Sequence, residues 1–419
     1  MKRIFISLFF FAFMWTAAGA DASPELLFVR WPANPDAVWY SFRIVPVTQH
    51  FGRKEMRPPI YEDGHVFRDS VMIEKEITDS YNGPGILCCQ VKAIGLDGQS
   101  ISAYSAPVPM EKAAQEMERY APKIRVKYHE QNGTVLLYPA YSFVKIPHAV
   151  SYEVEITDEE PENPDGCEPS VHRISQGVVT IPELFDELPR QGTVWWRVRG
   201  LDENGGPVGV WSEAEKIVND PAENWETGIL GDSISHGGGR MSYSPADWPY
   251  NYAYYLDFPT INMSRSGDKT EDLLRRFDAD VLPFHVRYLL IMGGTNNLRS
   301  GGTAEEVISD LEALQEKCRA NDIESVLLTI PPIAPDRIWK YYHQPMAENW
   351  KVEFDKVNGW IRTQPHIDTA APFAMYEDMP ENLAADGLHP DKEAKEKMGK
   401  IINEKFPEIR KKISGLVVK

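Results

Sequence analysis

The spacing of hydrophobic positions changes near residue 220. Before this point, short stretches alternate apolar and polar residues and are separated by Pro, Gly, Asn and Asp, which is typical of half-buried strands joined by turns. After it, short continuous apolar runs alternate with longer amphipathic stretches. The pattern therefore predicts an all-β N-terminal half and an α/β C-terminal half, in which helices cover both faces of a parallel sheet.

The C-terminal half, residues 225–419, is expected to form one three-layer α/β/α domain of flavodoxin-like arrangement. Its strands are predicted at residues 229–230, 260–262, 288–292, 325–330 and 366–369, and its clearest helices at residues 303–320, 346–362 and 392–406. Sites in such sheets form beyond the carboxyl ends of the strands. Polar residues that follow these strands are therefore the first candidates for a functional site.

The N-terminal half contains an internal repeat. Residues 37–44 match residues 149–156, residues 91–93 recur as 198–200, and Tyr-Ser at 104–105 corresponds to Trp-Ser at 211–212. This order predicts two β-sandwich modules, at 21–110 and 121–218, joined by a charged helical linker at 110–120. The modules resemble the fibronectin type III or immunoglobulin-like modules of exported enzymes.

The sequence leaves three roles open for the modules: glycan binding, contact with another protein, or spacing of the C-terminal domain. Trp39, Trp195 and Trp196 could stack on sugar rings. Inward-facing aromatic residues of strands more often belong to the core, which is the favoured interpretation.

Composition and charge exclude some classes of protein. The chain has 419 residues, of which 42% are hydrophobic and 11% aromatic, enough for two or three ordinary domains. Its net charge of −18 argues against a nucleic-acid partner, since phosphate binding needs a basic face.

The first twenty residues have the pattern of a signal peptide. Lys2 and Arg3 precede an apolar run at 4–15, and Ala-Gly-Ala at 18–20 is a cleavage signal after Ala20. The run is too short for a membrane span, and no later stretch is apolar enough for a transmembrane segment. The protein is therefore expected to be exported to the periplasm or the extracellular space.

The four cysteines, Cys88, Cys89, Cys167 and Cys318, lack the spacing of a metal site or a dense disulfide framework. A link from Cys88 or Cys89 to Cys167 stays open, although small buried hydrophobic residues are the favoured interpretation. No cofactor or metal is expected.

Four polar motifs follow the predicted strands or precede the last helix. They are Gly-Asp-Ser-Ile-Ser at 231–235, a segment ending in Ser-Gly-Asp at 262–268, Gly-Gly-Thr-Asn-Asn at 293–297 and Asp-Gly-Leu-His-Pro at 386–390. The set, in this order over about 190 residues, resembles the SGNH (GDSL-type) serine hydrolases. Each motif alone could be a turn or a helix cap.

The resemblance implies a role for each matching residue. Ser233 would be the nucleophile, His389 its base and Asp386 the partner of His389, and no cofactor would be needed. The backbone N–H groups of Ser233 and Gly267 and the side chain of Asn296 would form the oxyanion hole. The chain departs from the family at Asn297, where aspartate is common, so an ion pair at that position is in doubt.

The resulting hypothesis is a secreted serine esterase that hydrolyses an O-acyl ester, most simply O-acetyl on a carbohydrate, through a covalent acyl-enzyme. A lipid ester or thioester is the alternative substrate, and an adhesion protein with an inactive hydrolase domain is the alternative class. Other candidates for the pocket are His236 with the glycines at 237–239, and a group of aromatic residues: Tyr243, Trp248, Tyr250, Trp339, Tyr341 and Tyr342.

Overall fold

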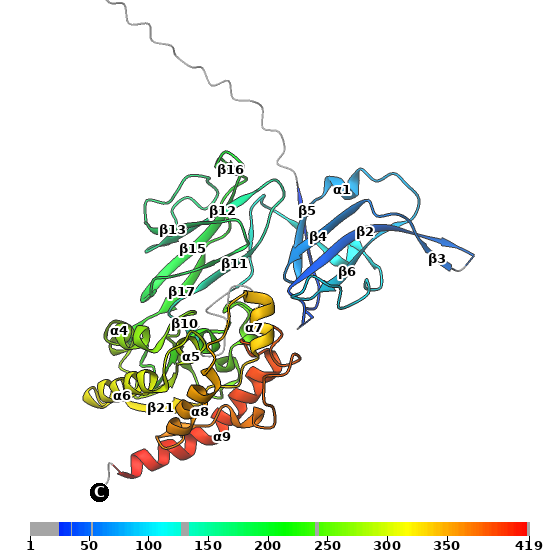
Figure 1. Ribbon diagram of the computed structural model, residues 1–419. Coiled ribbons are helices and arrows are strands. Elements are labelled where there is room, and N and C mark those ends of the chain that lie inside the picture. The colour runs from blue at the N-terminus through cyan, green and yellow to red at the C-terminus, as the bar shows by residue number, and fades with distance from the viewer. Residues whose placement is uncertain (1–24, 35, 52, 127–133, 239–242, 417–419) are drawn as a thin grey trace, which may run out of the picture.

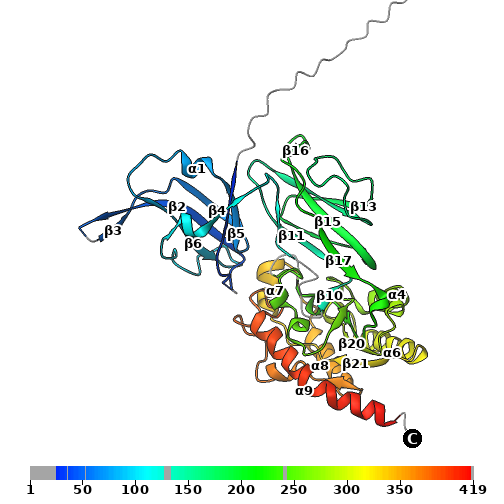
Figure 2. The ribbon, with the colours of Figure 1, turned by 180° about the vertical axis from the view of Figure 1, so that it is seen from behind.

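The computed structural model describes residues 25–416 except 35, 52, 127–133 and 239–242, so the expected signal peptide and its cleavage site lie outside the described residues. Two β-rich modules lie next to each other at one end of the C-terminal α/β domain (Figure 1). Figure 2 shows the same arrangement from behind. The predicted fold class, two all-β modules followed by a parallel sheet with flanking helices, is confirmed.

The first module consists of two antiparallel sheets. One has the order β5-β1-β8 and the other β3-β2-β6-β7, with β4 also pairing with β2. The strands are β1 (Leu26–Arg30), β2 (Trp39–His50), β3 (Arg53–Met56), β4 (Tyr61–Phe67), β5 (Ser70–Glu74), β6 (Ile86–Ile94), β7 (Val108–Pro109) and β8 (Ala114–Met117). The four-residue helices α1 (Glu76–Asp79) and α2 (Met110–Ala113) complete it. The expected helical linker at 110–120 is thus wrong for most of its length, because its second part pairs with β1 as β8.

The second module has the same construction. Its sheets have the orders β14-β11-β9 and β13-β12-β15-β16, with β17 also pairing with β15. The strands are β9 (Lys123–Ile124), β11 (Ala140–Val144), β12 (Ser151–Thr157), β13 (Arg173–Val179), β14 (Glu183–Phe185), β15 (Gly192–Leu201), β16 (Pro207–Val208) and β17 (Glu215–Asn219).

The sequence repeat corresponds to equivalent contacts in the two modules. In the first, the backbone N–H of Val91 donates to the Ser105 hydroxyl at 3.1 Å. In the second, the N–H of Val198 donates to the Ser212 hydroxyl at 3.0 Å. Each serine also donates its own N–H to the carbonyl of the same valine at 2.8 Å. The repeated Tyr-Ser and Trp-Ser pairs therefore close the same edge of each sandwich.

The C-terminal sheet is parallel and has the order β10-β19-β18-β20-β21-β22. Five strands lie where apolar runs predicted them: β18 (Thr227–Gly231), β19 (Thr260–Asn262), β20 (Tyr288–Met292), β21 (Glu324–Leu328) and β22 (His366–Ile367). The sixth, β10 (Thr134–Leu136), comes from the segment that the sequence assigned to the second module, and it pairs with β19. The second module and the sheet are therefore continuous in structure.

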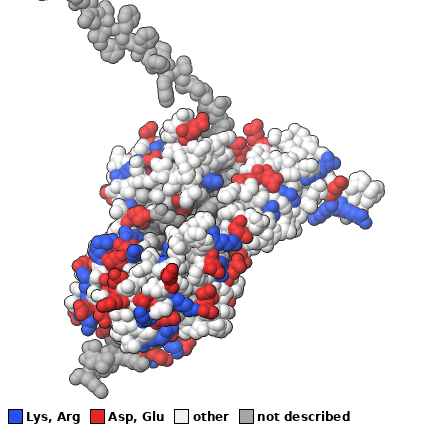
Figure 3. All heavy atoms as spheres, in the orientation of Figure 1, with Lys and Arg blue, Asp and Glu red and all other residues white. Residues whose placement is uncertain are grey.

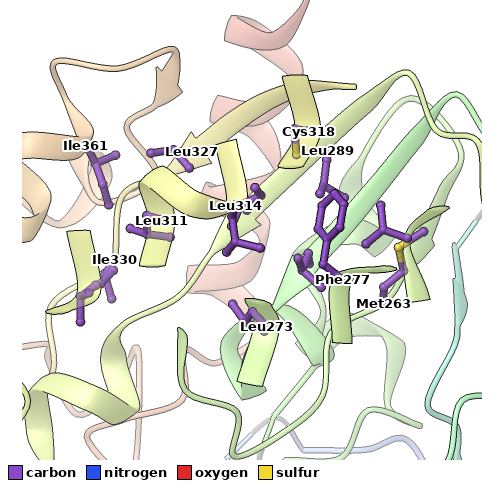
Figure 4. Packing of buried hydrophobic residues seen from close by; sticks show 14 of the residues in the cluster. Met263, Leu273, Phe277, Leu289, Leu311, Leu314, Cys318, Leu327, Ile330 and Ile361 are labelled. Carbon is purple, nitrogen blue, oxygen red and sulfur yellow. The ribbon is translucent and has the colours of Figure 1, made fainter. Parts of the chain in front are cut away.

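Helices cover this sheet, and the main ones are α4 (Thr270–Asp280), α6 (Ala304–Ala320), α7 (Pro335–Tyr342), α8 (Trp350–Ile361) and α9 (Lys392–Leu416). α6 begins with a capping box in which Thr303 and Glu306 satisfy each other's backbone N–H groups. Figure 4 shows Leu273, Phe277 and Leu314 from α4 and α6 packed with Leu289 of the central strand β20. Burial of these side chains holds the helices against the sheet and positions the strand ends.

The surface charges, the tryptophans of the β-modules and the cysteines have the following positions. Acidic and basic side chains are interspersed over the C-terminal domain, and basic residues gather near the tip of β3 (Figure 3). Trp196 is fully buried, whereas Trp39 and Trp195 are half-buried. All four cysteines are free thiols, three of them buried. Among the described residues, no helix is both long and apolar enough to span a membrane.

Candidate active site

Ser233 lies at the start of a one-turn helix directly after strand β18. The helix is α3 (Ser233–His236), and the carboxylate of its N-cap, Asp232, accepts the N–H of Ile234 at 2.9 Å. Gly231 is required before this turn, because a Cβ there would lie 2.6 Å from the carbonyl oxygen of Met292. The strand end and the cap together fix Ser233 at the carboxyl edge of the sheet.

Ser233, His389 and Asp386 form a continuous chain of hydrogen bonds. His389 Nε2 lies 2.9 Å from Ser233 Oγ, and His389 Nδ1 lies 2.7 Å from Asp386 Oδ2. All three are buried, with 7%, 4% and 0% of their surfaces exposed for Ser233, His389 and Asp386. Because a carboxylate only accepts, the ring carries its proton on Nδ1 and presents Nε2 as an acceptor to the serine hydroxyl.

The Asp386 carboxylate is held by its own loop. Its Oδ1 accepts the backbone N–H groups of Leu388 and His389, each at 2.8 Å. Gly387 makes this loop possible, since its φ is +78° and a Cβ there would lie 2.6 Å from the carbonyl oxygen of Ala334. The three-residue spacing of Asp386 and His389 therefore brings both side chains to one point.

Tyr342, at the end of α7, is a member of the site whose role the sequence did not predict. Its hydroxyl donates to Asp386 Oδ2 at 2.6 Å and lies 3.3 Å from His389 Nδ1. The sequence placed this residue only among aromatic residues near the pocket. Its contact depends on the docking of α7, for which no local motif gives a signal.

The candidate oxyanion donors lie on the loops after β19 and β20. Asn296, in the short helix α5 (Thr295–Arg299), donates one side-chain N–H to the carbonyl of Asp268 at 2.8 Å, and its Oδ1 accepts from Arg299 Nε at 3.4 Å. These contacts orient the amide and leave its second N–H available. Gly267 has a φ of +93°. Within the described part of the chain, the backbone N–H groups of Ser233 and Gly267 have no acceptor.

Asn297 explains the departure from the family pattern. Its Oδ1 accepts the N–H of Thr270 at 3.0 Å, and its Nδ2 donates to Glu271 Oε2 at 2.7 Å. An amide makes both bonds, whereas an aspartate would face the Glu271 carboxylate with a second negative charge. The uncharged residue thus ties α5 to the start of α4.

His236 does not line the pocket as the sequence suggested. It is buried, its Nε2 donates to the Tyr138 carbonyl at 2.7 Å, and its Nδ1 accepts the N–H of Ser266 at 3.2 Å. Burial lowers the pKa of His236 to about 4, so the ring is neutral at neutral pH. Its role is to join the nucleophile loop to the chain between β10 and β11.

A buried lysine lies against the nucleophile helix. Lys395 of α9 is fully buried and donates to the Ile234 carbonyl. Burial lowers the pKa of Lys395 to about 7, and burial raises the pKa of Asp232 to about 6.

Among the described residues, no cluster of three His, Cys, Asp or Glu side chains could hold a metal ion.

Residues 229–397 match the family model of the GDSL-like Lipase/Acylhydrolase family. The C-terminal domain is a member of this family. As the resemblance predicted, the chain is thus an ester-hydrolysing serine hydrolase built on a GDSL-like domain. The N-terminal modules lie outside the matched residues.

Individual proteins similar to the GDSL-like domain are distant. The thioesterase 1/protease 1/lysophospholipase L1 of Escherichia coli K12 is 29% identical over 171 residues, which are 40% of this chain and 76% of that protein. A GDSL-like lipase structure from Bacteroides thetaiotaomicron is 18% identical with a TM-score of 0.36, covering 45% of this chain and 90% of that one. A catalytic mutant of an acetylxylan esterase from Geobacillus stearothermophilus is 18% identical with a TM-score of 0.34, covering 42% and 92%.

Proposed function

We propose that the protein is an exported serine esterase that removes small O-acyl groups, chiefly O-acetyl, from a carbohydrate. The observation that carries the mechanism is the chain of hydrogen bonds from Ser233 through His389 to Asp386. The sequence pattern of a signal peptide and the two β-modules support a large exported substrate such as a polysaccharide.

In the proposed reaction, His389 Nε2 takes the proton of Ser233 as its Oγ attacks the ester carbonyl carbon. The N–H groups of Ser233 and Gly267 and the free side-chain N–H of Asn296 stabilise the negative oxygen that forms. His389 then gives the proton to the departing sugar oxygen, which leaves an acyl group on Ser233. Water, activated by the same histidine, attacks this acyl-enzyme and releases the acid.

The two partners of the His389 ring have different roles in this reaction. Asp386 stabilises the imidazolium and keeps Nε2 aimed at Ser233. Tyr342 donates to the same Asp386 oxygen as His389 and so spreads its negative charge. Asp386 and its tyrosine donor thus act together on the His389 ring.

The test compares Ser233→Ala with Ser235→Ala, a buried serine two residues later whose hydroxyl contacts Tyr252. We expect Ser233→Ala to lose turnover of p-nitrophenyl acetate by at least about 10³-fold, and Ser235→Ala to keep most of it. Equal activity of wild type and Ser233→Ala would contradict the mechanism. Acetate release from acetylated polysaccharides then tests the substrate.

A lipid or thioester substrate is the second candidate, favoured by the name of the Escherichia coli relative. Acyl esters of two to sixteen carbons distinguish the two. We expect kcat/KM to be highest for acetyl, whereas a maximum at eight or more carbons would support the lipid candidate and contradict an acetylesterase.

A further inference from the structure

A cavity of about 510 Å³ lies where the two β-modules meet the GDSL-like domain. Its walls come from the first module, from β9 and the residue after it, and from the loop at 246–250 that follows the nucleophile helix. Neither Ser233 nor His389 lines it. Its volume is within the range of sites for small ligands, which is about 300–1,000 Å³.

The cavity carries an excess of positive charge in a chain with a net charge of −18. Its charged lining residues are Arg30, Arg68, Lys123, Arg125, Asp69 and Asp247. Asp247 binds Arg68 at 3.0 Å and Arg125 at 3.1 Å, and Asp69 is 3.4 Å from Arg125. A further carboxylate, Glu183, lies behind this network, where it accepts from Ser244. The cations still outnumber the carboxylates.

Arg68 is a buried cation of the cavity wall. Its side chain is only 9% exposed, and it forms an ion pair with Asp247 at 3.0 Å. The residue adopts a φ of +64°, which is unfavourable for a side chain other than glycine. Its charge therefore contributes to the positive potential of the cavity from a fixed position in the wall.

Two further cations of the cavity are incompletely paired. The Arg30 side chain is 70% exposed and contacts Asp69 through Nε at 3.2 Å. The ammonium group of Lys123 lies 4.8 Å from the centre of the Phe28 ring, and no carboxylate among the described residues forms an ion pair with it. These groups can turn towards an anion without breaking the network around Asp247.

The remaining walls suit a sugar ring. Tyr250 contributes partly exposed aromatic surface beside the buried rings of Tyr40 and Trp248, and the partly exposed Asn34 contributes a hydrogen-bonding side chain. Flat aromatic surface packs against the apolar face of a sugar, while guanidinium and ammonium groups bind a carboxylate.

We propose that this cavity is an accessory site for a carboxylate-bearing sugar, a hexuronic acid residue of an acidic polysaccharide. One part of this inference rests on the proposed function: if the protein is an esterase, sugar binding in the cavity makes acetylated acidic glycans its preferred substrate. Binding itself needs no catalysis.

The cavity is connected with the catalytic loops through one aromatic stack. Tyr250, in the cavity wall, stacks on Tyr243 with ring centroids 4.2 Å apart and planes 15° apart. The Tyr243 hydroxyl in turn lies near the backbone of Ala385, next to Asp386. A glycan held in the cavity therefore contacts the loop that packs against the catalytic acid.

The test uses the double variant Arg30→Ala/Lys123→Ala, which leaves Arg68, Arg125 and Asp247 in place. Its matched control is Arg53→Ala/Lys54→Ala, the same change of charge on the exposed strand β3. Both are made in the full chain with Ser233→Ala, and calorimetry measures binding of a trimer of galacturonic acid and of its neutral analogue, galactotriose.

We expect the parent and the β3 variant to bind the acidic trimer at least about tenfold more tightly than the neutral one, with an affinity that falls as salt rises. The cavity variant should bind the acidic trimer at least about tenfold more weakly than the parent. Equal binding of both trimers by the parent, no binding by the parent, or unchanged binding by the cavity variant would overturn the proposal.

Turnover separates this proposal from the proposed function. With Ser233 intact, the cavity variant should keep its rate on p-nitrophenyl acetate and show a raised KM on acetylated galacturonan. An unchanged KM there contradicts the substrate preference. Absence of p-nitrophenyl acetate turnover by the wild-type protein would refute the proposed esterase function, whereas the binding measured by calorimetry would be unaffected.

Discussion

At the scale of single residues, the Asp386 carboxylate is the most heavily bonded group of the site. Two backbone N–H groups, the His389 ring and the Tyr342 hydroxyl all contact it. The two backbone N–H groups and the tyrosine hydroxyl hold the carboxylate in place beside the imidazolium that forms during the reaction.

Tyr342→Phe tests the tyrosine donor. Removing the hydroxyl takes away one of the donors that hold Asp386 Oδ2, so the carboxylate keeps the His389 ring less firmly aimed at Ser233. We expect kcat to fall about tenfold, as for loss of one hydrogen bond to a charged group. The neighbouring Tyr341→Phe is the control, and an unchanged kcat in Tyr342→Phe would contradict this role of the tyrosine.

Asn297→Asp tests the departure from the family motif. The new carboxylate would face Glu271 Oε2, to which Asn297 now donates at 2.7 Å. We expect the free energy of unfolding to fall by about 1–3 kcal/mol in chemical denaturation. Adding Glu271→Gln should restore most of the loss, because the new amide can donate to the carboxylate. A double variant as unstable as the single one would refute this explanation.

At the scale of helices and strands, the sequence predicts the elements whose pattern is local and misses those that depend on contacts with remote parts of the chain. β20 was placed correctly because its apolar run is continuous, and the β-modules because their repeat is visible. α7 and β10 were missed, since α7 is polar and aromatic and β10 has three residues whose partner is remote in sequence. The motif residues of the site were foreseen from the family resemblance, whereas Tyr342 was not, because its contact requires α7 to be docked.

The loop before α9 depends on Gly387. In Gly387→Ala, the left-handed φ of +78° and a Cβ that would lie 2.6 Å from the Ala334 carbonyl oxygen both oppose the native conformation. We expect a loss of about 1–3 kcal/mol in unfolding free energy, with reduced turnover because His389 is displaced. Gly359→Ala in α8, where a Cβ meets nothing within 4 Å, should instead be neutral or stabilising. Equal effects of the two changes would contradict the strain argument.

Helix α9 brings a buried titratable cation under the nucleophile helix. The pKa of Lys395 is lowered to about 7 by burial, whereas an unfolded lysine titrates near about 10.4. Between these values the unfolded state binds more protons, so this residue makes stability rise with pH from about 7 upwards. The contribution is at most about 1.4 kcal/mol per pH unit.

Lys395→Met should remove that rise. Unfolding free energies measured between pH 6 and 9 should increase less with pH in the variant than in wild type. Lys400→Met, on the exposed side of α9, is the control and should leave the slope unchanged. Parallel curves for wild type and Lys395→Met would show that the lysine keeps its proton throughout this range.

At the scale of the whole molecule, the GDSL-like domain is incomplete without the second module. β10 covers the edge of the sheet beside β19, and the Tyr138 carbonyl binds His236 in the nucleophile loop. The Tyr138 hydroxyl also donates to Asp280 of α4 at 2.6 Å. The second module and the GDSL-like domain, which the sequence analysis separates, thus share one packed core.

Truncation tests this dependence. A chain of residues 225–419 loses β10 and the Tyr138 contacts, and exposes an unpaired strand edge. We expect it to unfold at a lower temperature than a chain of residues 121–419, and to aggregate more in light scattering. The longer chain should retain turnover of p-nitrophenyl acetate. Equal melting temperatures of the two chains would show that β10 contributes little.

The position of β10 also has a consequence for folding. Thr134 pairs with Thr260, so the edge strand lies more than a hundred residues before its neighbour in the chain. Domains generally fold as units. The finished second module can therefore hold β10 as a template on which β19 and the later strands add in turn, and its folding lowers the loop-closure entropy of the parallel sheet. We infer that the second module then acts as an intramolecular folding aid for the hydrolase domain that follows it.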